Sequence, residues 1–183
     1  MHLLCALMAL LAAPFWEAKA PREWSDAQIQ ELLHDSPWAR MSDPQPLVQV
    51  YLASARPMRE AEEEWARRRG KKLNEDYLDY LANEGANKII LAIGLPIKQG
   101  LADEAESRRM EQESVMRVGR KTYKIEGQFP PVPSDPFLRL VFPRAVTEGD
   151  KGIVFELYLP ENGPYHQIEF PLRDLRYKGK LEL

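Results

Sequence analysis

Three residue types of a hydrolase triad stand side by side at His34, Asp35 and Ser36, directly before Pro37 and Trp38. In such a triad the serine, histidine and carboxylate form a chain of hydrogen bonds, and the three residues come from distant positions of the sequence. Successive residues of a helix point about 100° apart, so three neighbours at a helix end cannot form that chain. We therefore interpret this stretch as the end of a helix.

Histidine is the residue that a catalytic or metal site assembled from distant positions would need. Beyond residue 20 the sequence has two, His34 and His166. His166 follows an Asn-Gly turn, where we expect a solvated side chain. Zinc, calcium, phosphate-loop, dinucleotide and nucleophile-elbow motifs are all absent from the sequence. The sequence therefore predicts no catalytic, cofactor-binding or metal-binding residue, and a metal site built on the two histidines remains a minor alternative.

A run of glutamates between residues 60 and 64 is the densest group of carboxylates, and three arginines follow it. Consecutive residues of a helix cannot converge on one ion, which argues against a calcium site or a pair of catalytic carboxylates. Glu63 and Arg67, like Glu64 and Arg68, are spaced i,i+4 and are expected to pair along a helix. We interpret the run as a solvated, salt-bridged helix face.

Four helices are expected. The first begins at Ser25, a good N-cap, where Gln28 completes a capping box, and Pro37 ends it near residue 35. Its buried stripe is predicted to be Ile29, Leu32 and Leu33. The other helices are predicted over 57–69, 74–84 and 101–113. The inner face of the second is assigned to Met58, Ala61 and Trp65.

Strands are predicted between and after these helices. Val48, Val50 and Leu52 alternate with Gln49 and Tyr51, so the first strand should bury one face. The next strand, 88–96, is apolar on both faces and should be central in its sheet. From Ser114 onward, strands are predicted over 114–118, 122–126, 137–143, 152–160, 166–172 and 176–183.

The order of these elements predicts an α+β fold in a single domain over residues 21–183. Helices of the N-terminal half should pack on a mainly antiparallel sheet formed largely by the C-terminal half, where we expect a meander. The last strand is regular, with Leu175, Tyr177, Leu181 and Leu183 on one face and the basic residues on the other. A basic stripe could meet an anionic surface, but edge strands also carry lysine to prevent aggregation, and we favour that role.

The composition of the chain limits its function and compartment. Its 183 residues include 25 basic and 28 acidic side chains, a balance that argues against nucleic-acid binding. Residues 3–16 form an apolar run of signal-peptide length, too short to span a bilayer comfortably, and the small residues around Ala20 offer a cleavage site. Cleavage nearer Ala12, an uncleaved anchor, or a first helix of the domain are the alternatives.

The order of several segments also resembles a group of uncharacterised exported proteins of soil acidobacteria. The resemblance covers most of the chain beyond residue 20, and its hallmark is a helix that begins near a tryptophan and ends in a Ser-Pro-Trp-Ala run. The matching residues are Trp24, Ser36, Pro37, Trp38 and Ala39. That group has no known activity, cofactor or catalytic residue. The resemblance therefore implies export and a packed, structural role for Trp38.

Two functional hypotheses follow from the sequence. The first is a non-enzymatic envelope or secreted protein, periplasmic or extracellular, with a signal peptide over residues 1–20 and no membrane span in the mature chain. It would bind a partner protein or a glycan and use no cofactor. The alternative is an exported hydrolase whose site places His34 or His166 beside a distant carboxylate and a hydroxyl.

Overall fold

The computed structural model describes residues 13–43, 45–94, 103–162 and 165–183. The helices are α1 (Phe15–Ala18), the 3-10 helix η1 (Pro21–Glu23), α2 (Asp26–His34), α3 (Arg56–Arg68), α4 (Glu75–Asn83), the 3-10 helix η2 (Gly85–Asn87) and α5 (Glu104–Glu113). The strands are β1 (Ala39–Met41), β2 (Gln49–Leu52), β3 (Lys88–Gly94), β4 (Val115–Val118), β5 (Lys121–Lys124), β6 (Gly127–Phe129), β7 (Phe137–Pro143), β8 (Gly152–Leu157), β9 (His166–Pro171), β10 (Arg176–Tyr177) and β11 (Lys180–Leu181).

These strands form two larger sheets and a small hairpin. One sheet has the order β1-β2-β3-β7-β6 and the other β5-β4-β8-β9, while β10 and β11 pair with each other. Every pairing between the named strands is antiparallel, which confirms the α+β class. The expected meander is wrong, because β7 leaves the strands that follow it and pairs along its whole length with β3.

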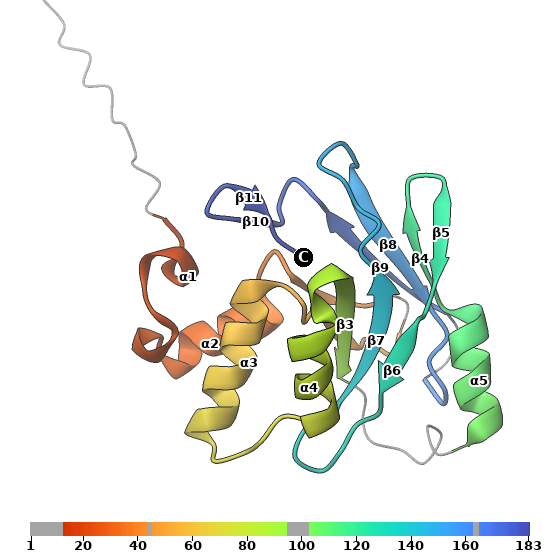
Figure 1. Ribbon diagram of the computed structural model, residues 1–183, viewed down its shortest axis with the longest axis horizontal. Helices are drawn as coiled ribbons and strands as arrows, with labels where there is room; N and C mark the ends of the chain where they lie inside the picture. Colours follow the sequence, from red (N-terminus) through yellow and green to blue (C-terminus); the bar gives the residue numbers. More distant parts are fainter. Residues whose placement is uncertain (1–12, 44, 95–102, 163–164) are drawn as a thin grey trace, which may run out of the picture.

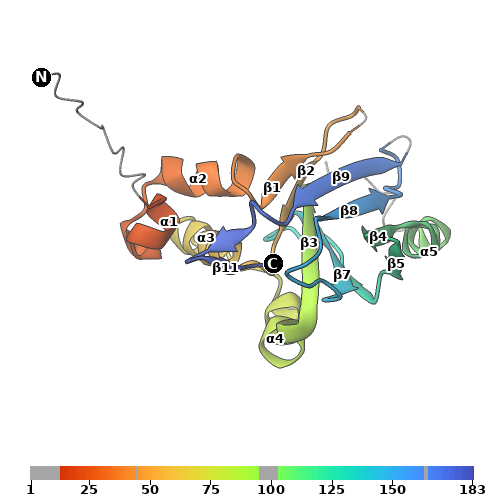
Figure 2. The ribbon, with the colours of Figure 1, turned by 90° about the horizontal axis from the view of Figure 1, so that it is seen from above.

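The helices lie on opposite sides of the strands. In both views α1, α2 and α3 gather on one side, and α5 lies at the far side, next to β4 and β5 (Figures 1 and 2). Within the described ranges, no helix combines the length and the apolar composition that crossing a bilayer requires. Helix α3 packs on the first sheet, and this packing of helix on sheet positions the candidate site.

Both faces of the first sheet are buried at its centre. Residues 89–93 of β3 are all fully buried, and β3 lies between β2 and β7, as its apolar sequence predicts. The end of the predicted strand, residues 95–96, lies outside the described residues. On β2 the expected alternation fails at Tyr51, which is 1% exposed. Its hydroxyl donates to Glu62 of α3, so the helix covers the face that the pattern assigned to solvent.

The sequence signals at α2 are confirmed. The Ser25 hydroxyl accepts from the Gln28 backbone amide at 3.1 Å, and the Gln28 side chain accepts from the Ser25 amide at 3.0 Å. Three apolar side chains of this helix, Ile29, Leu32 and Leu33, face the core. The helix ends at His34, with Asp35 as its C-cap.

Residues on the N-terminal side of Ala20 also pack on the fold. Phe15 and Trp16 form edge-to-face contacts with Trp24 and Trp38, with ring centroids 5.9 and 6.0 Å apart. The Glu17 carboxylate accepts from the backbone amide of Lys178 at 2.7 Å. The described end of the apolar N-terminal run, residues 13–16, therefore contributes to the packed structure together with the rest of α1. Residues 1–12, including Cys5, lie outside the described residues.

The C-terminal segment is a hairpin and not the single strand that its alternation predicts. Lys178 and Gly179 have φ angles of 49° and 77°, the backbone that a type I′ turn requires at both central positions. This turn reverses the chain between β10 and β11. After the hairpin, the backbone carbonyl of Glu182 accepts from the indole of Trp38 at 2.9 Å, and Leu183 is 1% exposed.

Candidate functional site

A cavity of about 130 Å³ lies between α3, the end of α2 and the start of β7. Its wall is mostly apolar, and the side chains that form it are Leu33, Trp65, Ala66, Leu73 and Phe137. Protein sites that bind small molecules are concave and largely apolar, with a few polar groups that fix orientation. The cavity has this composition, because its lining also includes the buried Glu62 and Asp135 and the exposed Arg69 and Lys71.

The buried polar groups of the cavity belong to an ion cluster in the core. Arg139 of β7 donates to Glu62 at 2.6 Å through one terminal nitrogen and to Asp135 at 2.7 Å through the other. All three side chains are at most 4% exposed. Tyr51 donates to the same Glu62 oxygen at 2.5 Å, and the Arg139 guanidinium lies 4.1 Å from the ring centre of Tyr77.

Burial and charge act in opposite directions on this cluster. Burial raises the pKa of the Glu62 carboxyl above its ordinary value, although Arg139 and the Tyr51 hydroxyl both lower it. Burial would lower the pKa of Arg139, but the charge of Glu62 holds that pKa above its ordinary value. Burial also raises the pKa of the Tyr51 hydroxyl, and the neighbouring Glu62 raises it further. Arg139 is therefore the residue that permits a charged Glu62 in the core.

Three polar atoms of the cluster have no hydrogen-bond partner among the described residues. They are the second carboxylate oxygen of Glu62, the Nε of Arg139 and the hydroxyl of Tyr77. A buried polar atom without a partner costs about 1–3 kcal/mol, and native proteins keep few of them. Residues with perturbed pKa values concentrate at functional sites, and Glu62, Tyr51 and Arg139 are such residues beside a cavity, which makes this region the leading candidate.

The cluster joins two segments far apart in the sequence, because Glu62 lies 77 residues before Arg139, whereas Asp135 and Arg139 are only four residues apart. Asp135 comes from the proline-rich loop before β7, where its carboxylate also accepts from the backbone amide of Asn74 at 3.1 Å. Asn74, the first residue of the helix predicted over 74–84, caps α4 by accepting from the amides of Asp76 and Tyr77. Sequence reasoning missed the whole cluster. An arginine in the middle of the apolar run 137–142 was the available signal, because a buried arginine requires an acidic partner.

The run of glutamates on α3 is not the solvated face that we predicted. Glu62 and Glu64 are both 5% exposed, and only Glu63 points fully to solvent. Glu64 accepts from Arg67 at 2.8 and 2.7 Å and from Arg68 at 2.8 Å. The predicted i,i+4 pair of Glu64 with Arg68 is confirmed, whereas Arg67 pairs with Glu64 at i,i+3. Glu62 and Glu64 are buried because α3 packs against the first sheet on one side and against the chain that enters α2 on another.

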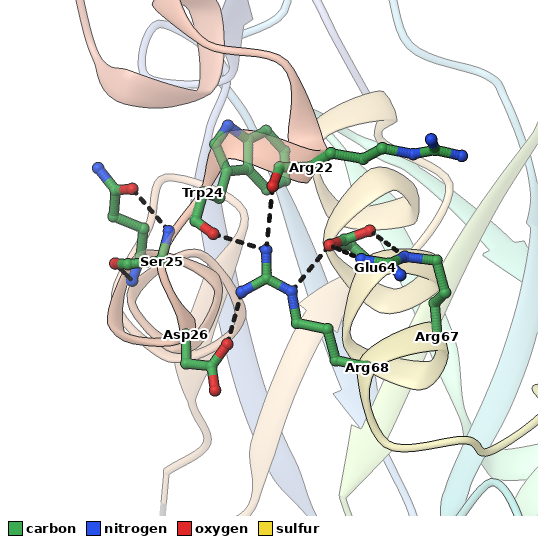
Figure 3. Close-up of polar contacts among 8 residues, drawn as sticks. Arg22, Trp24, Ser25, Asp26, Glu64, Arg67 and Arg68 are labelled. Carbon is green, nitrogen blue, oxygen red and sulfur yellow. Dashed lines mark hydrogen bonds and ion pairs between the residues drawn. The ribbon is translucent and has the colours of Figure 1, made fainter.

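Arg68 links α3 to the chain that enters α2 (Figure 3). Its guanidinium donates to the Asp26 carboxylate at 2.5 Å and to the backbone carbonyl of Trp24 at 2.6 Å. The bonds from Arg67 hold the pKa of Glu64 at about 2 against the effect of burial, and Arg68 lowers it further. Every polar atom that Figure 3 shows at Arg68 has a protein partner, so this network is structural.

The adjacent histidine, aspartate and serine do not form a triad. His34 is exposed, and its Nδ1 bonds the backbone carbonyl of Gln30 at 2.9 Å. Ser36 is buried, and its hydroxyl accepts from the Trp38 amide at 3.3 Å, a side-chain to backbone bond within the turn that follows the helix. Trp38 is fully buried, which confirms its predicted role as a packed anchor.

His166 is fully buried, so its prediction as a solvated turn residue is wrong. The alternation of β9 turns it inward together with Ile168 and Phe170. Its Nε2 lies 3.0 Å from the carbonyl of Asn162, and its Nδ1 lies 2.9 Å from the hydroxyl of Ser42. The tautomer with hydrogen on Nε2 satisfies both contacts, since a carbonyl can only accept. Gly163, the second residue of the predicted turn, lies outside the described residues.

These contacts do not assemble the predicted hydrolase site. His166 reaches a hydroxyl, but its other nitrogen faces a backbone carbonyl and not an acid, and Ser42 is only 1% exposed. A nucleophile must be open to its substrate. Among the residues that the structure describes, no three His, Cys, Asp or Glu side chains gather as a metal site would require.

A second, wider depression lies over the outer face of the sheet that contains β8 and β9. It is open to solvent and lined by polar side chains that include Arg117, Glu156, Gln167 and Glu169. Arg117 and Glu156 pair with each other across it at 2.8 Å. Polar side chains normally cover the solvated face of an antiparallel sheet, so the polar lining of this depression does not by itself indicate a binding site.

Comparisons of the chain with protein-family models, with curated proteins and with solved structures gave no match.

Proposed function

We propose that this chain is a non-enzymatic binding protein, exported to the periplasm or the cell exterior, whose ligand or partner inserts one group into the cavity beside α3. The observation that carries the proposal is the cavity itself, with an apolar wall next to the Glu62–Arg139–Asp135 cluster. Export is supported by the apolar N-terminal run, which has the length of a signal-peptide core.

A partner protein is better supported than a glycan at this cavity. Sugar rings stack on open aromatic faces, but the guanidinium of Arg69 already covers the Trp65 ring at 3.7 Å from its centre. A single apolar side chain or ring matches the wall, since an engineered apolar cavity of about 150 Å³ holds benzene. The open depression on the second sheet is where a glycan would bind, and Arg117 and Glu156 give it polar groups.

The test compares the wild-type chain with a variant whose cavity is filled. Ala66→Leu adds a branched side chain to the cavity wall at a half-buried helical position. Both proteins would be used in pull-downs from envelope extracts, with Arg117→Ala as the control for the second sheet. We expect a partner that the wild type and Arg117→Ala retain and that Ala66→Leu loses. Retention of every bound protein by Ala66→Leu would contradict the proposal.

Export has its own test. Residues 1–20 and residues 1–13 would each be fused to an alkaline phosphatase that is active only outside the cytoplasm. Activity of either fusion supports export, and inactivity of both argues against it. Sequencing the N-terminus of the secreted full chain would then locate the cut relative to Phe15 and Trp16, which pack on the fold.

A further inference from the structure

The cavity beside α3 has opposite charges at its two ends. Glu62 and Asp135 are buried at its inner end, whereas Arg69 and Lys71 are exposed and lie at its opening. Glu62 and Arg69 are seven residues apart, which places them on the same side of α3 and about 10 Å apart along its axis. A ligand inside the cavity therefore meets carboxylates at one end and cations at the other.

The two cations at the opening form no ion pair or side-chain hydrogen bond with the residues that the structure describes. The neighbouring arginines differ, because Arg67 and Arg68 both bind Glu64. Arg69 instead stacks on Trp65, which holds its guanidinium above the cavity wall. A guanidinium fixed in this way offers its N–H groups to a carboxylate with little loss of side-chain freedom.

The size of the cavity limits what can lie below these cations. A volume of about 130 Å³ admits one six-membered ring or one branched aliphatic group, and a long acyl chain does not fit. The buried carboxylates of Glu62 and Asp135 would repel an anion at the inner end. The anionic group of a ligand must therefore stay at the opening, with its apolar group inside.

We propose that the cavity binds an apolar carboxylate, with a ring or branched alkyl group against Leu33 and Phe137 and the carboxylate on Arg69 and Lys71. This inference rests on the proposed function, because it specifies the group that enters the same cavity. Such a group is found in a free aryl carboxylic acid and in the C-terminal residue of a partner chain that ends in an apolar side chain.

Calorimetric titration of the wild-type chain with three matched small molecules tests the charge requirement. Phenylacetate has the ring and the anion, phenylacetamide is its neutral isostere, and phenethylamine replaces the anion with a cation. Charge-assisted hydrogen bonds are stronger than neutral ones, so phenylacetate should bind about tenfold more tightly than phenylacetamide. Phenethylamine should bind more weakly than either, because Arg69 and Lys71 repel it.

A pair of peptides distinguishes the two sources of the carboxylate. N-acetyl-glycyl-phenylalanine with a free C-terminus would be compared with the same peptide as its C-terminal amide. Binding of the free acid at least as tight as that of phenylacetate, with loss on amidation, supports a partner's C-terminus. Binding of phenylacetate but of neither peptide supports a free acid as the ligand.

Variants place the binding at this cavity. Arg69→Gln combined with Lys71→Gln should remove the preference for phenylacetate over phenylacetamide, and Ala66→Leu should abolish the binding of both. Lys72→Gln is the matched control, because Lys72 is 82% exposed and does not line the cavity. In the wild type, the indole N–H signal of Trp65 should shift on titration, a readout that needs no variant.

Two results would overturn the inference, and only one of them would also contradict the proposed function. If phenylacetate and phenylacetamide bind equally and the double glutamine variant changes neither, the carboxylate requirement is wrong while the cavity remains a binding site. If none of the small molecules or peptides binds or shifts the Trp65 signal, both this inference and the cavity-based function are wrong.

Discussion

Replacing Arg139 with methionine tests whether the buried ion cluster is charged. The substitution removes hydrogen bonds of 2.6 and 2.7 Å and leaves Glu62 and Asp135 in the core without their cation. Breaking a buried ion pair in this way typically costs about 3–5 kcal/mol. That is a large share of the roughly 5–15 kcal/mol that stabilises a domain, so the urea midpoint should fall strongly. Arg117→Met is the control, since Arg117 lies on a strand but is 51% exposed, and the loss of its pair should cost about 1 kcal/mol or less.

The same variant has a predicted pH dependence. Without Arg139, the effect of burial on Glu62 is less opposed, and its pKa in the folded state rises further above the unfolded value of about 4.3. The folded state then binds more protons than the unfolded state, so stability falls as pH rises from the unfolded pKa through the folded pKa. We therefore expect Arg139→Met to lose less stability at pH 5 than at pH 8.

Urea unfolding followed by far-ultraviolet circular dichroism at pH 5 and pH 8 measures both effects. Adding Glu62→Gln to Arg139→Met should reduce the difference in stability between the two pH values, because one of the two buried carboxyls that lost their cation is then gone. A loss for Arg139→Met no larger than that for Arg117→Met, or an equal loss at both pH values, would refute the argument that a charged Glu62 depends on Arg139.

Three further predictions concern the packing of the helices. Trp38→Ala removes a fully buried side chain, so it should cost about 3–5 kcal/mol of stability and lower the melting temperature by roughly 10 °C. His34→Ala should change the melting temperature little, and calorimetry of both variants would show this ranking. An unchanged melting temperature for Trp38→Ala would contradict it. Glu64→Gln should lower the free energy of unfolding at pH 7, because a carboxyl with a folded pKa of about 2 stabilises the fold while it is ionised. The variant should also lose less stability than the wild type between about pH 4.3 and 2. Denaturant titrations over this pH range that show equal losses for both proteins would contradict this. A chain lacking residues 1–20 should melt below one lacking residues 1–13, because only the first loses the aromatic contacts of α1, and equal melting temperatures would mean that these contacts do not stabilise the fold.

Local signals in the sequence predicted local structure well. The capping box at Ser25, the start of a helix at residue 74 and the buried strand 89–93 each depend on residues close in the chain, and all three are confirmed. The hairpin at Lys178 was missed, because its hydrophobic alternation continues through a turn that only two positive φ angles reveal. Alternation gives the face of a side chain, but it does not show where the chain reverses.

The candidate site could not be predicted in the same way. Arg139 and Glu62 are 77 residues apart, and their contact depends on α3 packing across the first sheet. The glutamate run has the charge pattern of a solvated helix, and only this packing decides that Glu62 and Glu64 turn inward. Similarly, the burial of His166 follows from the phase of β9, which one residue of register would have reversed.

The contacts of the C-terminal segment have a consequence for how the protein forms during synthesis. The bond between Trp38 and Glu182 closes a separation of 144 residues, and that between Glu17 and Lys178 closes one of 161. Contacts of such separation slow folding, because the entropy of closing the loop is lost before the contact forms. While residues 175–183 are still inside the ribosome, Trp38 and Glu17 lack these C-terminal partners. The chain should thus remain incompletely folded until residues 175–183 have left the ribosome.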